Sequence, residues 1–143
     1  MSTTAVTVRP YEGRDEEAVV ALWSSVFAGD PPWNEPRAMI RRKLTVQPEL
    51  FLVAERGGAV VGTVLAGFDG VRGWIHHLAV DPGHRRAGIG GELMRAAEAG
   101  LTRLGCPKVN LQVRATNTAV IAFYESLGYD VEERASMGRR LGN

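Results

Sequence analysis

Two kinds of hydrophobic spacing alternate along the first third of the chain. Valine alternates with a polar residue over 6–8, which predicts a short strand. After Asp15, a residue type that caps helix N-termini, apolar residues recur at helical spacing: Ala18, Val19, Leu22 and Val26. The proline-rich stretch 29–36 breaks this helix. A second helix is predicted to begin at Pro36 and to end before Pro48.

The middle of the chain is a series of strand patterns joined by glycine turns. Strands are predicted over 50–55 and 59–68, because Arg56-Gly57-Gly58 between them is a hairpin signal. Asp69-Gly70 makes the next turn and leads into a strand over 74–80. The three strands together predict an antiparallel meander.

The second half returns to helical spacing after a glycine-rich loop. Apolar residues at every third or fourth position predict a helix over 89–104. A strand alternates over 109–113, and another helix is predicted between a cap at Thr116 or Asn117 and a stop at Gly128. With 143 residues and no repeat or linker, the chain is predicted to form a single mixed α/β domain over 1–143.

Composition excludes several classes of protein. Hydrophobic residues make up 45% and charged residues 23% of the chain, as in globular proteins, and no apolar run approaches the ~20 residues of a membrane span. A net charge of +1 favours neither nucleic acid nor an anionic membrane as partner. One cysteine, and no secretory pattern in residues 1–9, predict a cytoplasmic protein.

The segment 81–91 passes from a strand to a helix through a glycine-rich loop. A helix N-terminus offers unpaired N–H groups and a partial positive charge, glycines let the backbone approach closely, and Arg85 and Arg86 add charged donors. These features favour a phosphate-bearing ligand, although a glycine-rich turn can also serve only to pack a helix close to a sheet. Gly90-Gly91-Glu92 lacks the lysine and hydroxyl of a nucleotide-binding P-loop, and Leu93 stands where a dinucleotide fingerprint needs a small residue.

The same segment resembles motif A of the GCN5-related N-acetyltransferase (GNAT) superfamily. In the motif Arg/Gln-x-x-Gly-x-Gly/Ala, the matching residues are Arg85, Gly88 and Gly90. Two more blocks resemble that superfamily, residues 78–82 and residues 117–129 with their Phe123-Tyr124-Glu125. The chain looks most like the YpeA-type subgroup in four segments: 33–36, 51–55, 105–108 and 138–141.

The resemblance implies a GNAT fold, acetyl-coenzyme A as cofactor and no metal. That fold is a central, mostly antiparallel sheet with a splayed parallel pair in the middle, flanked by about four helices. The coenzyme's pantetheine arm would lie beside Leu78, Ala79 and Val80, at a bulge, with one N–H facing the thioester oxygen. Asn117 matches a position that contacts this arm, and it is also expected to cap a helix. The pyrophosphate would be bound by the loop residues Arg85, Arg86, Ala87, Gly88, Ile89, Gly90 and Gly91.

The resemblance assigns the general acid to Tyr124, which would protonate the departing thiolate. Apart from the resemblance, Tyr124 can also be interpreted as an amphipathic aromatic residue at a helix–sheet boundary. Many members carry a glutamate as base at the position aligned with His76, and this chain has none there. His76 has a suitable intrinsic pKa, but it fits equally well as a sheet histidine satisfied by hydrogen bonds.

Two other groups are candidate bases, His77 and a chain of water molecules. Strand alternation predicts that His76 and His77 lie on opposite faces, so that only one of them reaches the reacting amine and the two make a poor metal pair.

The acceptor pocket of this superfamily is shaped by the loop between the first two helices, where Trp33 and Asn34 lie. Asp30 and Glu35 beside them either attract a cationic amine or are merely solvated. Cys106 lies between a helix end and a strand start, and it is predicted to be structural rather than catalytic.

Three functions follow from these residues. The first is an acetyl-coenzyme A-dependent N-acetyltransferase, in which a primary amine of a small molecule or a protein attacks directly in a ternary complex. The second is a non-catalytic acyl-coenzyme A-binding module or sensor. The missing glutamate favours the second, and Tyr124 favours the first. A nucleotide-phosphate module is the third, and it predicts that ATP or NAD competes for the loop.

The fifteen residues after Gly128 have room for one long strand or two very short ones. Many members of the superfamily end in a longer hairpin. We therefore expect a second subunit to complete the sheet edge, which makes the protein a homodimer.

Overall fold

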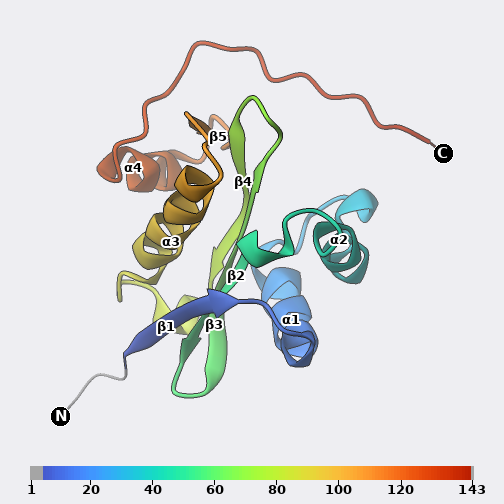
Figure 1. The fold of residues 1–143 in the computed structure, drawn as a ribbon, viewed down its shortest axis with the longest axis vertical. Helices are drawn as coiled ribbons and strands as arrows, with labels where there is room; N and C mark the ends of the chain where they lie inside the picture. Colours follow the sequence, from blue (N-terminus) through green and yellow to red (C-terminus); the bar gives the residue numbers. More distant parts are fainter. Residues whose placement is uncertain (1–4, 143) are drawn as a thin grey trace. The chain divides into compact units, whose positions relative to one another are not determined.

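The computed structural model describes residues 5–142, and these form two compact units that divide between Leu111 and Gln112 (Figure 1). The first unit holds a five-stranded sheet with strand order β1-β2-β3-β4-β5. Pairing is antiparallel from β1 to β4 and parallel between β4 and β5. The strands are β1 (Val6–Pro10), β2 (Phe51–Arg56), β3 (Ala59–Phe68), β4 (Gly73–Val80) and β5 (Val109–Leu111).

Helices cover both faces of this sheet (Figure 1). On one face, α1 (Glu16–Val26) and α2 (Pro36–Lys43) bury a core that includes Trp23, Phe51 and Leu65. On the other face lies α3 (Ile89–Arg103), whose buried residues keep the predicted spacing: Ile89, Leu93, Met94, Ala97 and Leu101. Short 3-10 turns stand at the loops: η1 (Gly13–Asp15), η2 (Pro32–Asn34), η3 (Pro48–Leu50) and η4 (Pro82–His84).

Asp15 lies directly before α1, as predicted, but its side chain does not cap that helix. Its carboxylate accepts hydrogen bonds from both terminal nitrogens of Arg9, at 2.8 and 2.9 Å, and from the Glu12 backbone N–H at 2.8 Å. The Arg9 guanidinium and the Glu12 N–H therefore occupy the carboxylate oxygens that would otherwise accept N–H groups of α1. The prediction of a cap was therefore wrong.

The second unit contains α4 (Thr118–Ser126). Asn117 caps it, accepting the Val120 N–H at 3.3 Å, and Gly128 follows it with φ 96°. The expectation that the last fifteen residues hold one or two strands was wrong for the described part, because residues 129–142 contain neither helix nor strand.

The predicted fold class is confirmed, a mixed α/β fold with a mostly antiparallel sheet, one parallel pair and four α-helices in the described residues. The parallel pair lies at the end of the strand order rather than in its middle, because no described residue after α4 adds a strand beyond β5. β5 ends at Leu111 and pairs only with Gly73–Ile75 of β4. On the β5 side, β4 therefore has no paired strand over 76–80 within residues 5–142.

Candidate active site

The glycine-rich loop ends at a helix N-terminus with open N–H groups. Gly88 precedes α3 with φ 76°, and no side chain caps the helix. The first backbone bond into the helix runs from Glu92 N–H to the Gly88 carbonyl, at 3.1 Å. The N–H groups of Ile89, Gly90 and Gly91 therefore have no acceptor within the helix. Together with the helix dipole they form a site suited to a phosphate group.

The position of this loop is fixed by close packing at Gly62 of β3. A Cβ there would lie 3.0 Å from both the Ala79 carbonyl oxygen and the Leu93 Cδ1. A larger residue at position 62 would require the Ala79 carbonyl or the Leu93 side chain to shift by a few tenths of an ångström. The loop is thereby held at the end of β4, beside the stretch that β5 leaves unpaired.

β4 contains a bulge in the middle of that stretch. Pairing with β3 passes from Thr63↔Ala79 to Leu65↔His76, so two residues of β4, His77 and Leu78, oppose one of β3. His77 has φ 49°, a left-handed conformation that is rare outside glycine. A bulge here agrees with what the family resemblance implies.

The bulge changes which way the two histidines point. His76 pairs opposite Leu65, and Leu65 belongs to the core under α1 and α2. The ring of His77 also lies on that face, with centroids 4.9 Å from Trp23 and 4.4 Å from Phe27 of α1. The prediction of opposite faces was therefore wrong, because the extra residue of the bulge breaks the strict alternation of the strand.

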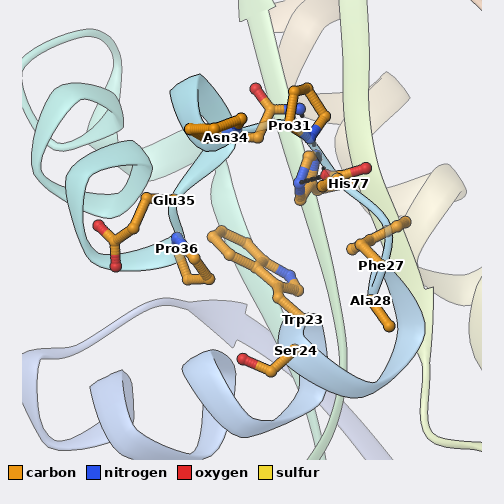
Figure 2. A pocket seen from close by; sticks show the side chains of 11 residues that line it. Trp23, Ser24, Phe27, Ala28, Pro31, Asn34, Glu35, Pro36 and His77 are labelled. Carbon is orange, nitrogen blue, oxygen red and sulfur yellow. Dashed lines mark hydrogen bonds and ion pairs between the residues drawn. The ribbon is translucent and has the colours of Figure 1, made fainter.

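A pocket of about 290 Å³ opens between α1, the 28–36 loop and β4 (Figure 2). His77 reaches into it from β4, and Asn34 and Pro31 come from the 28–36 loop. Its lining is mostly apolar with a few polar groups: Trp23, Ser24, Phe27, Ala28, Asp30, Pro31, Pro32, Asn34, Glu35, Pro36 and His77. This volume is at the small end of ligand pockets, which run from roughly 300 to 1,000 Å³.

Asp30 and His77 lie in contact in this pocket. The Asp30 Oδ2 lies 3.4 Å from the His77 Nε2 and accepts a hydrogen bond from the Asn34 Nδ2 at 3.3 Å. A carboxylate beside Nε2 favours the tautomer that carries its proton there, which leaves the Nδ1 lone pair available. Burial lowers the pKa of His77, and the charge of Asp30 opposes that effect. The ring is thereby kept neutral at neutral pH.

The other residues of the 28–36 loop differ in their positions. Asn34 lines the pocket, whereas Trp33 does not, and its side chain is 52% exposed. The Glu35 carboxylate caps α2 by accepting the Arg37 and Ala38 N–H groups, and these bonds lower its pKa. His76 lies outside the pocket lining; partial burial of its ring and the nearby charge of Lys43 lower its pKa.

Sequence reasoning missed three residues of this region, Trp23, Phe27 and Thr63. Each fits an ordinary core position of a helix or strand, so no sequence signal separates them from the rest of the core. Cys106, predicted to be structural, donates a hydrogen bond to the Lys108 carbonyl at 3.3 Å.

In the second unit, Tyr124 is buried in an aromatic cluster. Its ring centroid lies 5.1 Å from that of Phe123 and 5.7 Å from that of Tyr129. Burial raises the pKa of Tyr124 to about 12, so the hydroxyl keeps its proton at neutral pH. Asn117 precedes the same helix and serves as its cap.

Two kinds of feature are absent from residues 5–142. No group of three or more His, Cys, Asp or Glu side chains there is placed to hold a metal ion. None of the helices described is long and apolar enough to cross a membrane.

The fold resembles that of solved structures, one of which is an N-acetyltransferase. An aminoglycoside N-acetyltransferase solved with coenzyme A has a TM-score of 0.82 at 18% identity, over 99% of this chain and 98% of that one. Ard1 from Thermoplasma volcanium has a TM-score of 0.80 at 28% identity, over 90% of this chain and 84% of that one.

Relatives identify the family. Acetyltransferases of Yersinia enterocolitica and Pectobacterium atrosepticum are each 43% identical to this chain over 134 residues, which is 94% of this chain and 94% of each relative. The model of the acetyltransferase (GNAT) family matches residues 17–129. The chain belongs to that family and is an enzyme of the N-acetyltransferase class, so the resemblance seen in the sequence is confirmed.

Proposed function

We propose that this protein moves an acetyl group from acetyl-coenzyme A to a small primary amine by direct attack in a ternary complex. One observation carries the proposal: β4 borders both the phosphate-suited loop and the pocket. Its unpaired stretch, 76–80, leads into the loop before α3, and His77 from the same stretch lines the pocket. A thioester along β4 and an amine in the pocket would therefore meet at His77 and Leu78.

The loop fits the pyrophosphate of coenzyme A. The open N–H groups of Ile89, Gly90 and Gly91 and the two exposed arginines, Arg85 and Arg86, would hold it. Ala87 and Gly88 complete the loop, and nothing lies within 4 Å of the place where a Cβ of Gly88 would be. Leu78, Ala79 and Val80 would contact the pantetheine arm through their backbone, and Asn117 is a further proposed contact. Acetyl-coenzyme A supplies an activated thioester.

Three groups of this chain would act on the reacting atoms. The Nδ1 of neutral His77 takes a proton from the amine, since an ammonium group has no lone pair with which to attack. The Leu78 N–H donates to the carbonyl oxygen as negative charge develops on it. Tyr124, protonated at neutral pH, donates its proton as the C–S bond breaks.

His77 is a better candidate base than His76. Its ring lines the pocket and its tautomer is set by Asp30, whereas His76 lies outside the lining. A water chain and His76 are the alternatives that the same experiment tests.

The pocket favours a small ammonium-bearing acceptor. The Asp30 carboxylate attracts a cation, and the rings of Trp23 and Phe27 provide apolar contact. Asn34 adds an amide to the lining, and Trp33 lies beside it in the same loop, where a larger acceptor would reach it.

The test is thiol release from acetyl-coenzyme A with a panel of primary amines. We expect turnover with at least one small amine, a large loss of kcat in His77→Gln and nearly full activity in the matched control His76→Gln. Tight coenzyme binding without turnover on any amine favours a binding module instead, the reading that the missing β4 glutamate supports. Displacement of coenzyme A by ATP or NAD would favour a nucleotide module.

Two further proposals concern assembly. The family match spans the division at Leu111, which supports one N-acetyltransferase domain over 1–143. β5 ends the strand order, and an end strand offers unpaired backbone groups to a second subunit, which supports a homodimer. A monomeric sedimentation coefficient would contradict the dimer.

A further inference from the structure

Thr63 joins α1 to the bulge of β4 through two buried hydrogen bonds. It is fully buried, and with Asp15 it makes up the buried polar and charged residues found between 5 and 142. Its Oγ1 accepts the indole N–H of Trp23 at 2.8 Å and donates to the His77 carbonyl at 3.0 Å. An indole N–H can only donate, so the hydroxyl must accept there and has its one proton left for His77. The chemistry of the groups therefore fixes the direction of both bonds.

The His77 carbonyl shares a peptide plane with the Leu78 N–H. No cis peptide bond occurs in residues 5–142, and in a planar trans peptide the N–H points opposite to the C=O. The Thr63 hydroxyl, by holding the His77 oxygen, therefore sets the direction of the Leu78 N–H. Leu78 has no paired residue on β3, so β3 does not fix this N–H by pairing.

The conformation of His77 needs such support. A left-handed φ in a residue with a Cβ is strained, and it persists only where its surroundings hold it. Thr63 holds the carbonyl, while Trp23, Phe27 and Asp30 hold the ring. Trp23 contributes to both, since its N–H fixes Thr63 and its ring lies against the imidazole.

We propose that Thr63 is a positioning residue for acetyl transfer, which aims the Leu78 N–H at the thioester oxygen and keeps His77 in the pocket. The inference rests on the proposed function, because it needs the thioester to lie along β4. Thr63 does not itself line the pocket, and it acts through His77 and Trp23, which do.

Two substitutions separate the hydroxyl from the volume of the side chain. Thr63→Val keeps the shape and removes both hydrogen bonds, and Thr63→Ser keeps the hydroxyl and loses one methyl group. In Thr63→Val the Leu78 N–H is still present, but its direction is no longer fixed. We therefore expect kcat to fall about 10-fold, which is less than the roughly 10²–10³-fold loss of kcat when an oxyanion donor is removed. Coenzyme A affinity should stay within about twofold, and Thr63→Ser should recover most of the wild-type kcat.

A spectroscopic measurement reports on the N–H itself. Infrared difference spectra of acetyl-coenzyme A labelled with carbon-13 at the thioester carbonyl show how strongly that oxygen accepts hydrogen bonds. We expect a shift to lower frequency on binding to the wild type, a smaller shift with Thr63→Val and a restored shift with Thr63→Ser. The band of the bound thioester comes only from folded protein, so partial unfolding does not imitate this result.

The outcomes separate the inference from the proposed function. Equal kcat and equal carbonyl frequency in wild type and Thr63→Val overturn the positioning role. An equal loss of kcat in Thr63→Val and Thr63→Ser also overturns it, because that result indicates an effect of packing alone. A wild type that releases no thiol with any amine, yet shows the expected frequency differences, overturns the proposed transfer to a small primary amine and leaves the orientation of the Leu78 N–H supported.

Discussion

Removing the charge of Asp30 should move the acid limb of the pH–rate profile to lower pH. His77 acts as a base only when neutral, so activity falls as pH drops through its pKa. Burial lowers that pKa, and Asp30 raises it. Asp30→Asn keeps the shape and an oxygen that can accept from Asn34, but it no longer stabilises the imidazolium. The pKa of His77 should therefore fall, and activity should persist further into acid.

The size of the shift follows from the separation of the two groups. At the 3.4 Å between Asp30 Oδ2 and His77 Nε2, unit charges interact by about 1.2 kcal/mol even at the dielectric constant of water. About 1.4 kcal/mol corresponds to one pKa unit, so the acid limb should move down by about one pH unit. Partial burial of the pair strengthens the interaction, which makes this a lower bound.

The assay is kcat/KM for the amine, measured by thiol release at saturating acetyl-coenzyme A. The measurements run across pH 4–9, which extends about two units to either side of a histidine's ordinary pKa. Ionisation of the amine is common to both proteins, so only the enzyme's limb can differ. Asp69→Asn is a matched control: it removes one carboxylate at the β3–β4 turn and keeps the oxygen that accepts the Val71 and Arg72 N–H groups. An acid limb that stays in place or moves up in Asp30→Asn would refute His77 as the base.

Three other substitutions test the loop, the acid and the fold. Gly90→Val should abolish coenzyme A binding, measured by calorimetry, in a protein whose circular dichroism is unchanged, since a side chain would fill the space of the pyrophosphate; unaltered affinity would mean the site is elsewhere. Tyr124→Phe should lower kcat more than coenzyme affinity, and equal turnover would remove the general-acid role. Asp15→Asn should lower the free energy of urea unfolding by about 2 kcal/mol, because it removes the charge of one of the two carboxylates that bind the half-buried Arg9 and leaves only Glu55. Arg9 lowers the pKa of Asp15, so the difference between the two proteins should be full above about pH 4 and should shrink as pH falls further; a difference independent of pH would contradict this account.

Local signals explain why most of the fold was predictable from the sequence. Periodicity located α1 and α3, the turn signal Arg56-Gly57-Gly58 located the β2–β3 hairpin, and the proline at 36 marked the start of α2. The loop before α3 was predictable too, because its glycines and arginines are consecutive. The asparagine cap and glycine stop of α4 are equally local.

Glycines show where local signals are insufficient. Those at turns were recognised, but Gly62, Gly73 and Gly100 lie inside regular elements where another element comes close. A Cβ on Gly73 would lie 2.8 Å from the Cys106 sulfur, and one on Gly100 would collide with Leu50. Such contacts join residues distant in the chain, so the sequence does not mark them.

The sequence by itself determined the order of elements, the glycine-rich N-terminus of α3 and the family, because each depends on neighbouring residues. Only the tertiary structure decided which histidine enters the pocket. Alternation predicts opposite faces for His76 and His77, and a two-residue bulge cancels that prediction. The bulge is held by a hydroxyl on β3 that also binds Trp23, a residue 40 positions earlier in the chain. A side chain's direction on a strand depends on the register with its neighbour, and register is a property of the folded sheet.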